Sequence, residues 1–252
     1  MNKSDISFFS CLSCGKDLHV EAFEINNNNE ANLETGVVYC QSCKTMYPVS
    51  EGIPFLIDCG YYIKSFDTDS FFTRWRDKFP FEEYRLLKGK TDSGKFRQLE
   101  FFNDDPKAYD DKVSHSSFWM ANDWNTLHRW IAEFPENSII LDMGCGTGRC
   151  TIPIAQKGKG HVIGTDISIG MLRRAILKCA EAGLDNITFF LSDAEQLPLK
   201  AGKFTTVISF GMLHHVEDPA AIIKQSWKIL KKGGVFYALE NNMSPLRPVF
   251  DM

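Results

Sequence analysis

The sequence predicts an α/β protein, in which a small N-terminal zinc-binding domain precedes a doubly wound, mostly parallel, Rossmann-like sheet. Three observations predict this fold. An apolar run ends in a glycine-rich turn over residues 141–149. Strand-like and helix-like runs then alternate over residues 138–252, which is typical of a parallel sheet. Two Cys-x-x-Cys pairs stand within the first sixty residues.

Length and charge divide the chain of 252 residues into three expected parts. Residues 1–60 form the zinc domain with net charge −5, residues 61–137 a linker and helical cap with −2, and residues 138–252 the α/β core with +3. The N-terminus has no long apolar segment, so we expect no signal peptide, no membrane span and a cytoplasmic protein. The acidic first part weakens, but does not exclude, a nucleic-acid partner.

The paired cysteines predict a structural zinc site with the ligands Cys11, Cys14, Cys40 and Cys43. Four thiolates close all tetrahedral positions of zinc, which excludes a catalytic role for the metal. Metal binding then drives the folding of a part too small to fold alone. The alternative is two coincidental pairs of buried thiols.

Between the zinc domain and the core we expect a helix that begins at Ser116 or Ser117. Its apolar residues recur every three or four positions and therefore share one face: Met120, Trp124, Leu127, Ile131 and Phe134. Tyr109 precedes this helix and could reach over a ligand as a lid, or be an ordinary loop aromatic.

The core is expected to hold five strands and three helices. The strands are placed at 139–143, 161–166, 187–191, 204–210 and 235–240. The helices are placed at about 149–158, 168–182 and 219–231, and Gly233-Gly234 forms the turn into the last strand.

The glycine turn after the first core strand distinguishes between nucleotide cofactors. Such a turn brings a ligand close to the backbone and to the N–H groups of the following helix. The dinucleotide fingerprint G-x-G-x-x-G would need its third glycine at Arg149, whereas this turn reads G-x-G-x-G from Gly144 to Gly148. The difference favours S-adenosylmethionine (SAM) over a nicotinamide cofactor.

Two acids follow the next strands. Asp166 stands 20 residues after Gly146 and can accept both hydroxyls of a ribose, or cap a helix. Asp193, beside Ala194, can accept from an adenine amino group, or serve as another cap.

Together, Leu141–Arg149, Asp166, Ser192–Leu199, Ile208–Pro219 and Leu230–Val235 resemble class I SAM-dependent methyltransferases, chiefly the branch that acts on small molecules, lipids and quinones. Residues 8–58 resemble the zinc-ribbon activator proteins of methyltransferases, and the arrangement is similar to rRNA guanine methyltransferases with an N-terminal zinc module. The resemblance implies a SAM site, with Asp142 and the glycine turn at the methionine moiety, Asp166 at the ribose and Asp193 at the adenine. The expected cofactor-binding residues are Asp142, Gly144, Cys145, Gly146, Gly148, Asp166, Ile167, Asp193, Ala194 and Phe210.

The resembled family has a seven-stranded sheet whose last two strands form a hairpin, and only about a dozen residues follow the fifth strand here. We therefore expect a missing hairpin and an unpaired edge, which self-association or the N-terminal segments would cover.

His214 and His215 end the fourth strand, where either could act as a general base or merely line the SAM pocket. The strand lacks the Asn-Pro-Pro-Tyr loop of methylases that act on exocyclic and amide nitrogens. The expected function is methyl transfer from SAM to a small molecule or lipid. The alternatives are an rRNA base methyltransferase and a non-catalytic protein that binds SAM or a partner.

Overall fold

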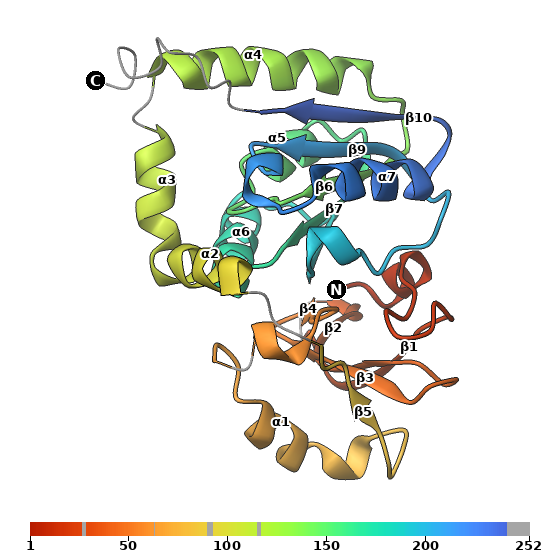
Figure 1. Cartoon of the computed structure of the whole chain (residues 1–252). Helices are drawn as coiled ribbons and strands as arrows, with labels where there is room; N and C mark the ends of the chain where they lie inside the picture. Colours follow the sequence, from red (N-terminus) through yellow and green to blue (C-terminus); the bar gives the residue numbers. More distant parts are fainter. Residues whose placement is uncertain (27–28, 63, 90–92, 115–116, 241–252) are drawn as a thin grey trace.

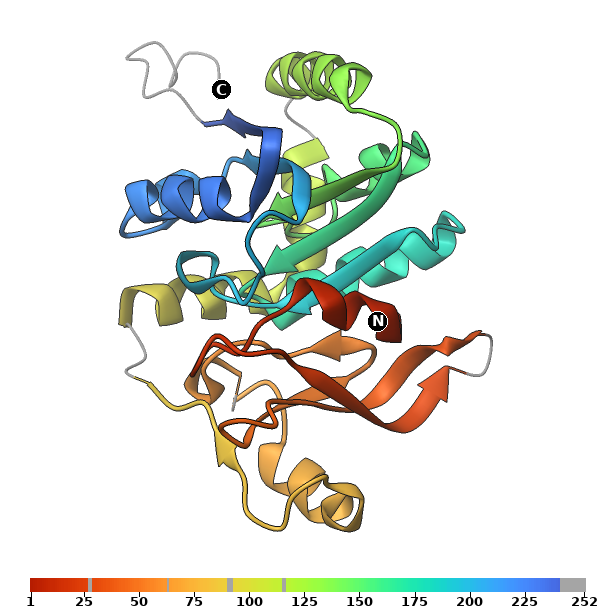
Figure 2. The ribbon, with the colours of Figure 1, turned by 90° about the vertical axis from the view of Figure 1, so that its right-hand side faces the viewer.

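The computed structural model of the chain describes residues 1–26, 29–62, 64–89, 93–114 and 117–240. Their strands form two five-stranded sheets, one near the N-terminus and one near the C-terminus. The N-terminal segment, with the 3-10 helix η1 (Lys3–Phe8), lies between the two sheets (Figures 1 and 2). Of the described residues, no helix is long and apolar enough to cross a membrane.

The first sheet is mostly antiparallel, in the order β1-β2-β3-β4, with β5 parallel to β3. Its strands are β1 (His19–Asn26), β2 (Asn29–Tyr39), β3 (Thr45–Ser50), β4 (Ile53–Pro54) and β5 (Arg85–Leu86). Three short helices connect β4 to β5: η2 (Cys59–Tyr61), α1 (Thr68–Arg74) and η3 (Arg76–Lys78). Phe71 and Phe72 of α1 pack against Phe23, Val37 and Met46 of the sheet, so the chain from 66 to 86 folds onto the N-terminal unit.

The second sheet is parallel throughout, in the order β10-β9-β6-β7-β8. Its strands are β6 (Ser138–Met143), β7 (Gly160–Asp166), β8 (Ile187–Leu191), β9 (Phe204–Phe210) and β10 (Leu230–Leu239). The described helices around it are α2 (Ser93–Asp104), α3 (Pro106–Ser114), α4 (Ser117–Glu133), α5 (Thr151–Gln156), α6 (Ile169–Glu181) and α7 (Pro219–Ile229). The five predicted core strands are therefore present.

The last predicted strand and helix need a correction at their shared boundary. The helix expected to reach residue 231 ends at Ile229, because Leu230 already pairs with Phe204. The chain then leaves the ladder through Gly233, whose φ is +80°, and pairing resumes where Val235 meets Thr206. The predicted helices at 149–158 and 168–182 are likewise shorter, at α5 and α6.

The two faces of the parallel sheet are covered differently. Leu127 and Ile131 of α4 and Ile154 of α5 pack on one face, against Ile140 and Val162. Trp124 and Phe134 of the predicted stripe also contact this cluster, whereas the side chain of Met120 lies outside the described part. The apolar stripe predicted for α4 thus covers the sheet.

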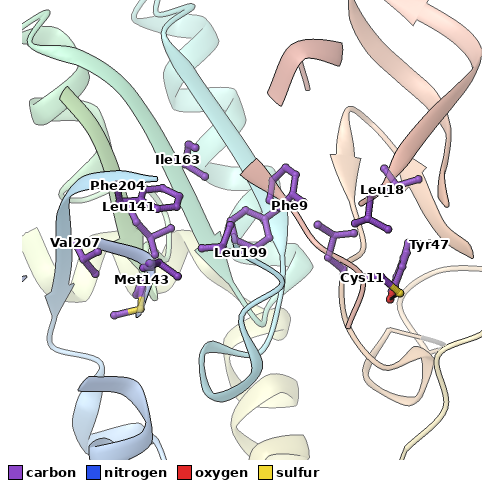
Figure 3. Packing of buried hydrophobic residues seen from close by; sticks show 14 of the residues in the cluster. Phe9, Cys11, Leu18, Tyr47, Leu141, Met143, Ile163, Leu199, Phe204 and Val207 are labelled. Carbon is purple, nitrogen blue, oxygen red and sulfur yellow. Dashed lines mark hydrogen bonds between the residues drawn. The ribbon is translucent and has the colours of Figure 1, made fainter. Parts of the chain in front are cut away.

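The N-terminal segment covers part of the other face. The crossover from β8 to β9 contains only the 3-10 helix η4 (Ala194–Gln196), and Phe9 fills the space beside it. Phe9 is fully buried, with its ring centroid 5.0 Å from that of Phe190, and forms a bridge with Leu199 (Figure 3). One buried cluster therefore extends from Cys11 and Tyr47 to the parallel sheet.

The two edges of the parallel sheet differ as well. At the end of β8, the N–H of Leu56 donates to the carbonyl of Leu191 at 2.9 Å. In the crossover that follows, the N–H of Ser10 donates to the carbonyl of Pro198 at 2.8 Å. The N-terminal segments thus cover the β8 edge. Among the described strands, none pairs with the outer side of β10.

Candidate functional site

A cavity lies at the carboxyl ends of β6, β7, β8 and β9, and residues of α2 and α3 form part of its wall. Parallel α/β sheets bind ligands at this edge. Its walls are apolar and aromatic with a few polar groups, formed by Lys95, Phe102, Tyr109, Gly144, Gly146, Thr165, Asp166, Ile167, Met171, Ser192, Asp193, Ala194, Phe210, Gly211, Met212, His215 and Val216. Of the ten predicted cofactor-binding residues, seven line this cavity: Gly144, Gly146, Asp166, Ile167, Asp193, Ala194 and Phe210.

The glycine turn leaves β6 through left-handed backbone that disfavours other residues. Gly144 has φ +66°, and a Cβ there would lie 2.4 Å from Cγ of Met212. Gly146 has φ +52°, and a Cβ there would meet no atom within 4 Å. The turn therefore packs tightly against Met212 at one glycine and leaves open space for a ligand at the next.

Asp166 ends β7 and holds the glycine turn in place. Its Oδ2 accepts from the N–H of Gly146 at 2.9 Å, and its Oδ1 accepts from the N–H of Ser168 at 2.9 Å. Ser168, not Asp166, caps α6. Burial raises the pKa of Asp166, although these backbone hydrogen bonds favour the carboxylate.

Asp193 does cap a helix, the short η4, through the N–H of Glu195 at 2.9 Å. Its other oxygen lies 2.7 Å from Nζ of Lys95, which also pairs with Glu195. Burial disfavours the ammonium, but the two carboxylates outweigh that effect and raise the pKa of Lys95. The carboxylate of Asp193, which we predicted to bind an adenine amino group, is thus paired with a charged lysine of α2.

The other three predicted cofactor residues, Asp142, Cys145 and Gly148, do not line the cavity. Asp142 is buried, and its Oδ2 accepts from Oγ1 of Thr151 at 2.6 Å. Burial raises the pKa of Asp142 to about 7. Cys145 is buried too, with its Sγ toward Gly164, while Gly148 approaches Ile152. These three residues therefore pack against the glycine turn on the side that faces away from the cavity.

The two predicted histidines occupy the 3-10 helix η5 (Leu213–His215) and differ in position. His215 lines the cavity, and its ring centroid lies 5.5 Å from that of Phe102. Burial and the neighbouring His214 lower the pKa of His215. His214 lies outside the cavity wall, with Nδ1 2.8 Å from Oε2 of Glu240. Oε1 of Glu240 accepts from the backbone N–H groups of residues 212 and 213 and so fixes η5.

Lys95 and Phe102 are cavity residues that the sequence analysis missed. They stand seven residues apart on α2 and so share one face, which is a weak signal of a ligand-facing helix. Tyr109 lies in α3 rather than in a loop, and it lines the cavity as expected for a lid. Asn103 ties α2 to α6, because its Oδ1 lies 2.6 Å from Oγ of Ser168.

The four cysteines of the predicted metal site meet at one point. Their Sγ atoms all lie within 4.8 Å of one another, and the Cys11–Cys43 and Cys14–Cys40 distances are 3.5 Å. Four sulfurs around zinc at about 2.3 Å would lie nearly this close together. The donor set and its spacing fit a closed tetrahedral zinc site.

Comparisons with known proteins agree with this geometry. A family model described as a methyltransferase domain matches residues 140–234. A demethylmenaquinone methyltransferase of Lactococcus lactis subsp. lactis is 32% identical over 168 residues, which cover 65% of each protein. One of Bacillus velezensis is 33% identical over 139 residues, covering 54% of this chain and 59% of the relative. The chain thus spans less than two thirds of the length of these relatives.

Solved structures are also similar, among them the YcgJ protein from Bacillus subtilis. It is 26% identical with a TM-score of 0.45, and the match covers 50% of this chain and 54% of that one. Residues 140–234 of this chain thus match a methyltransferase domain, and this part of the chain is similar to the demethylmenaquinone methyltransferases.

Proposed function

We propose that the chain binds SAM in the cavity and transfers its methyl group to a small-molecule or lipid acceptor of the quinone type. The observation that carries the proposal is that the glycine turn, Asp166 and Asp193 meet at one cavity. The open space over Gly146 and the buried carboxylate beside it suit an adenosyl group. The quinone class is suggested by the names of the curated relatives. Phe102, Tyr109 and Phe210 offer aromatic walls for a planar acceptor.

In this proposal, Asp166 accepts from the ribose hydroxyls while its hold on Gly146 keeps the glycine turn open for the methionine moiety. Asp193 accepts from the adenine amino group once Lys95 shifts toward Glu195, which it already contacts. Ile167 and Ala194 pack against the adenosyl group from the walls of the cavity. Asp142, Cys145 and Gly148 act from behind the turn as its support.

SAM supplies an electrophilic methyl group, so the protein mainly positions the acceptor and excludes water. The proposed base is His215, because it lines the cavity and its lowered pKa keeps it neutral at pH 7. His215 takes the proton of an acceptor that must lose one. His214, held by Glu240, positions its neighbour, and the two ring centroids lie 4.0 Å apart.

The zinc proposed for the four cysteines is structural and joins the two knuckles of the N-terminal sheet. The proposed domains remain residues 1–60, 61–137 and 138–252, although the chain from 66 to 86 folds with the first. The four cysteines outside the zinc site are free thiols, which suits a reducing compartment, so the cytoplasm is the proposed location. Self-association through the β10 edge is also proposed, to be checked by light scattering.

The test is a transfer assay with radiolabelled SAM and demethylmenaquinone as the acceptor, chemically reduced to the quinol, because only the electron-rich quinol ring can attack the electrophilic methyl group. Menaquinone, in which the acceptor carbon already carries the methyl group, serves as the matched control. We expect label in the quinone fraction with the first acceptor only. Label in RNA instead would favour the rRNA base methyltransferase. SAM binding without transfer to quinone, RNA, protein or extract metabolites would favour the non-catalytic alternative.

A further inference from the structure

The exposed side of α7 combines apolar and basic side chains. Trp227 is 64% and Ile223 40% exposed, and their spacing of four residues places them on one side of the helix. Lys224 follows Ile223 in the sequence, Lys228 follows Trp227, and both lysines are exposed. Large apolar side chains left in water beside cations typically mark an interaction surface.

More lysines gather where α7 ends. Lys231 and Lys232 follow Leu230 at the start of β10 and are exposed. The N–H of Lys203 donates to the carbonyl of Ile229 at 2.8 Å, which places a further lysine beside the helix end. We call the set of Lys203, Ile223, Lys224, Trp227, Lys228, Lys231 and Lys232 the α7 surface.

The charge of the α7 surface is not neutralised within the described chain. Residues 219–239 contain four lysines and no acid, although the whole chain has net charge −4. No described carboxylate lies within 4.0 Å of any of the five lysine ammonium groups. The complementary partner is therefore an anionic one.

We propose that the α7 surface docks on an anionic lipid bilayer, with Trp227 and Ile223 in the headgroup boundary and the lysines against acidic lipids. An amphipathic helix with Trp on its apolar side and lysines beside it lies on membranes in this way. Trp prefers the interface, and lysine stems reach from it to phosphate groups. A base-stacking nucleic-acid surface would need several aromatic platforms, and the exposed apolar partner of Trp227 on this helix is an isoleucine.

The position of α7 fits such docking. The helix lies to one side of the parallel sheet, above the N-terminal sheet in Figure 2, and α2 lies toward the same side. The chain enters α7 directly from His215 and Val216, which line the cavity. The start of α7 is therefore near the cavity, whereas Lys203, Lys231 and Lys232 lie at the amino ends of β9 and β10, at the opposite edge of the sheet. The surface itself does not depend on which acceptor the cavity takes.

Vesicle sedimentation of the full chain tests the proposal. We expect binding to vesicles of phosphatidylcholine mixed with phosphatidylglycerol, weaker binding at high salt, and none to phosphatidylcholine alone. Each lysine near such a surface contributes up to about fivefold in partitioning, so changing Lys224, Lys228, Lys231 and Lys232 to Gln should weaken binding at least about tenfold. Trp227→Ala should weaken it as well.

The matched control changes four exposed lysines elsewhere to Gln, at Lys3, Lys16, Lys107 and Lys157, with the same loss of charge. It should bind within about twofold of the unchanged chain. Equal losses in both quadruple variants would overturn the proposal, as would absence of binding to the mixed vesicles. Binding of a labelled RNA oligonucleotide through the same lysines, without vesicle binding, would assign the surface to nucleic acid. Titration with SAM in parallel keeps these results separate from the proposed function.

Discussion

At the scale of single residues, the cavity concentrates acids whose protonation is shifted by burial. Asp142 lies behind the glycine turn, whereas Asp166 lines the cavity. Burial raises the pKa of both carboxyl groups, and the negative charge of Asp166 raises the pKa of Asp142 further. A site that holds two such carboxyl groups costs stability at neutral pH. That cost is acceptable where a cationic ligand gains from the same charges.

Asp142 gives a prediction on the pH dependence of stability. Its pKa is raised from 3.8 to about 7, so the unfolded chain ionises first, and stability falls as pH rises from about 4 toward 7. Asparagine does not ionise, so the stability of Asp142→Asn should not fall in this way. In thermal unfolding, the stability of the variant relative to the unchanged protein should therefore increase from pH 4 to pH 7. Asp185→Asn, at an exposed position, is the control, and a constant difference between pH 4 and 7 would contradict the shifted pKa.

Sequence reasoning at this scale placed Asp166 and Asp193 at the cavity, because parallel strands bring their carboxyl ends together. It could not place Lys95, whose contact with Asp193 joins residues 98 positions apart. The sequence also does not reveal that Asp142 and Cys145 point away from the cavity. Their direction depends on the pleat of β6 and on contacts with Thr151 and Gly164.

At the scale of elements, the core strands were predicted well, because buried parallel strands read as apolar runs between glycine turns. The boundary between α7 and β10 was less accurate, since early pairing of Leu230 with Phe204 is a tertiary effect. The helices α2 and α3 were not placed in advance. Their ends are fixed by contacts such as Asn103 with Gly170, which local sequence does not encode.

The zinc knuckles give a prediction at this scale. Cys40→Ser should lower the zinc content below one per chain and speed amide exchange in β1, β2 and β3. Because Cys11 and Cys40 share a buried cluster with Phe190, exchange in β8 should rise as well. Ser42→Ala, an exposed change in the same knuckle, is the control. Full zinc content in Cys40→Ser would refute the four-thiolate site.

At the scale of the whole molecule, the N-terminal unit and the parallel sheet share one core. Phe9 fills the place where a crossover helix would cover the sheet, and Leu56 pairs with β8. The sequence showed both units but not their docking, because the contacts join residues almost two hundred positions apart. The N-terminal segments were one expected cover for the uncovered edge, and they cover the β8 edge rather than β10.

This shared core predicts that the chain unfolds as one unit. Phe9→Ala should lower the free energy of unfolding by about 3–5 kcal/mol, the cost of removing a buried phenylalanine. Denaturation followed by calorimetry should still give one transition. Phe101→Ala, at a side chain that is 70% exposed, should have little effect. Two separate transitions in the unchanged protein would show that the units fold independently.

The central claim is that the cavity at the carboxyl ends of the strands binds SAM, and calorimetric titration tests it most directly. The unchanged chain should bind one SAM, and Asp166→Ala should weaken binding by about 1–3 kcal/mol, the loss of a charged hydrogen-bond acceptor. Asp185→Ala should bind as the unchanged chain does. Equal affinity in Asp166→Ala would remove that residue from the site, and binding of NADH without SAM would contradict the account as a whole.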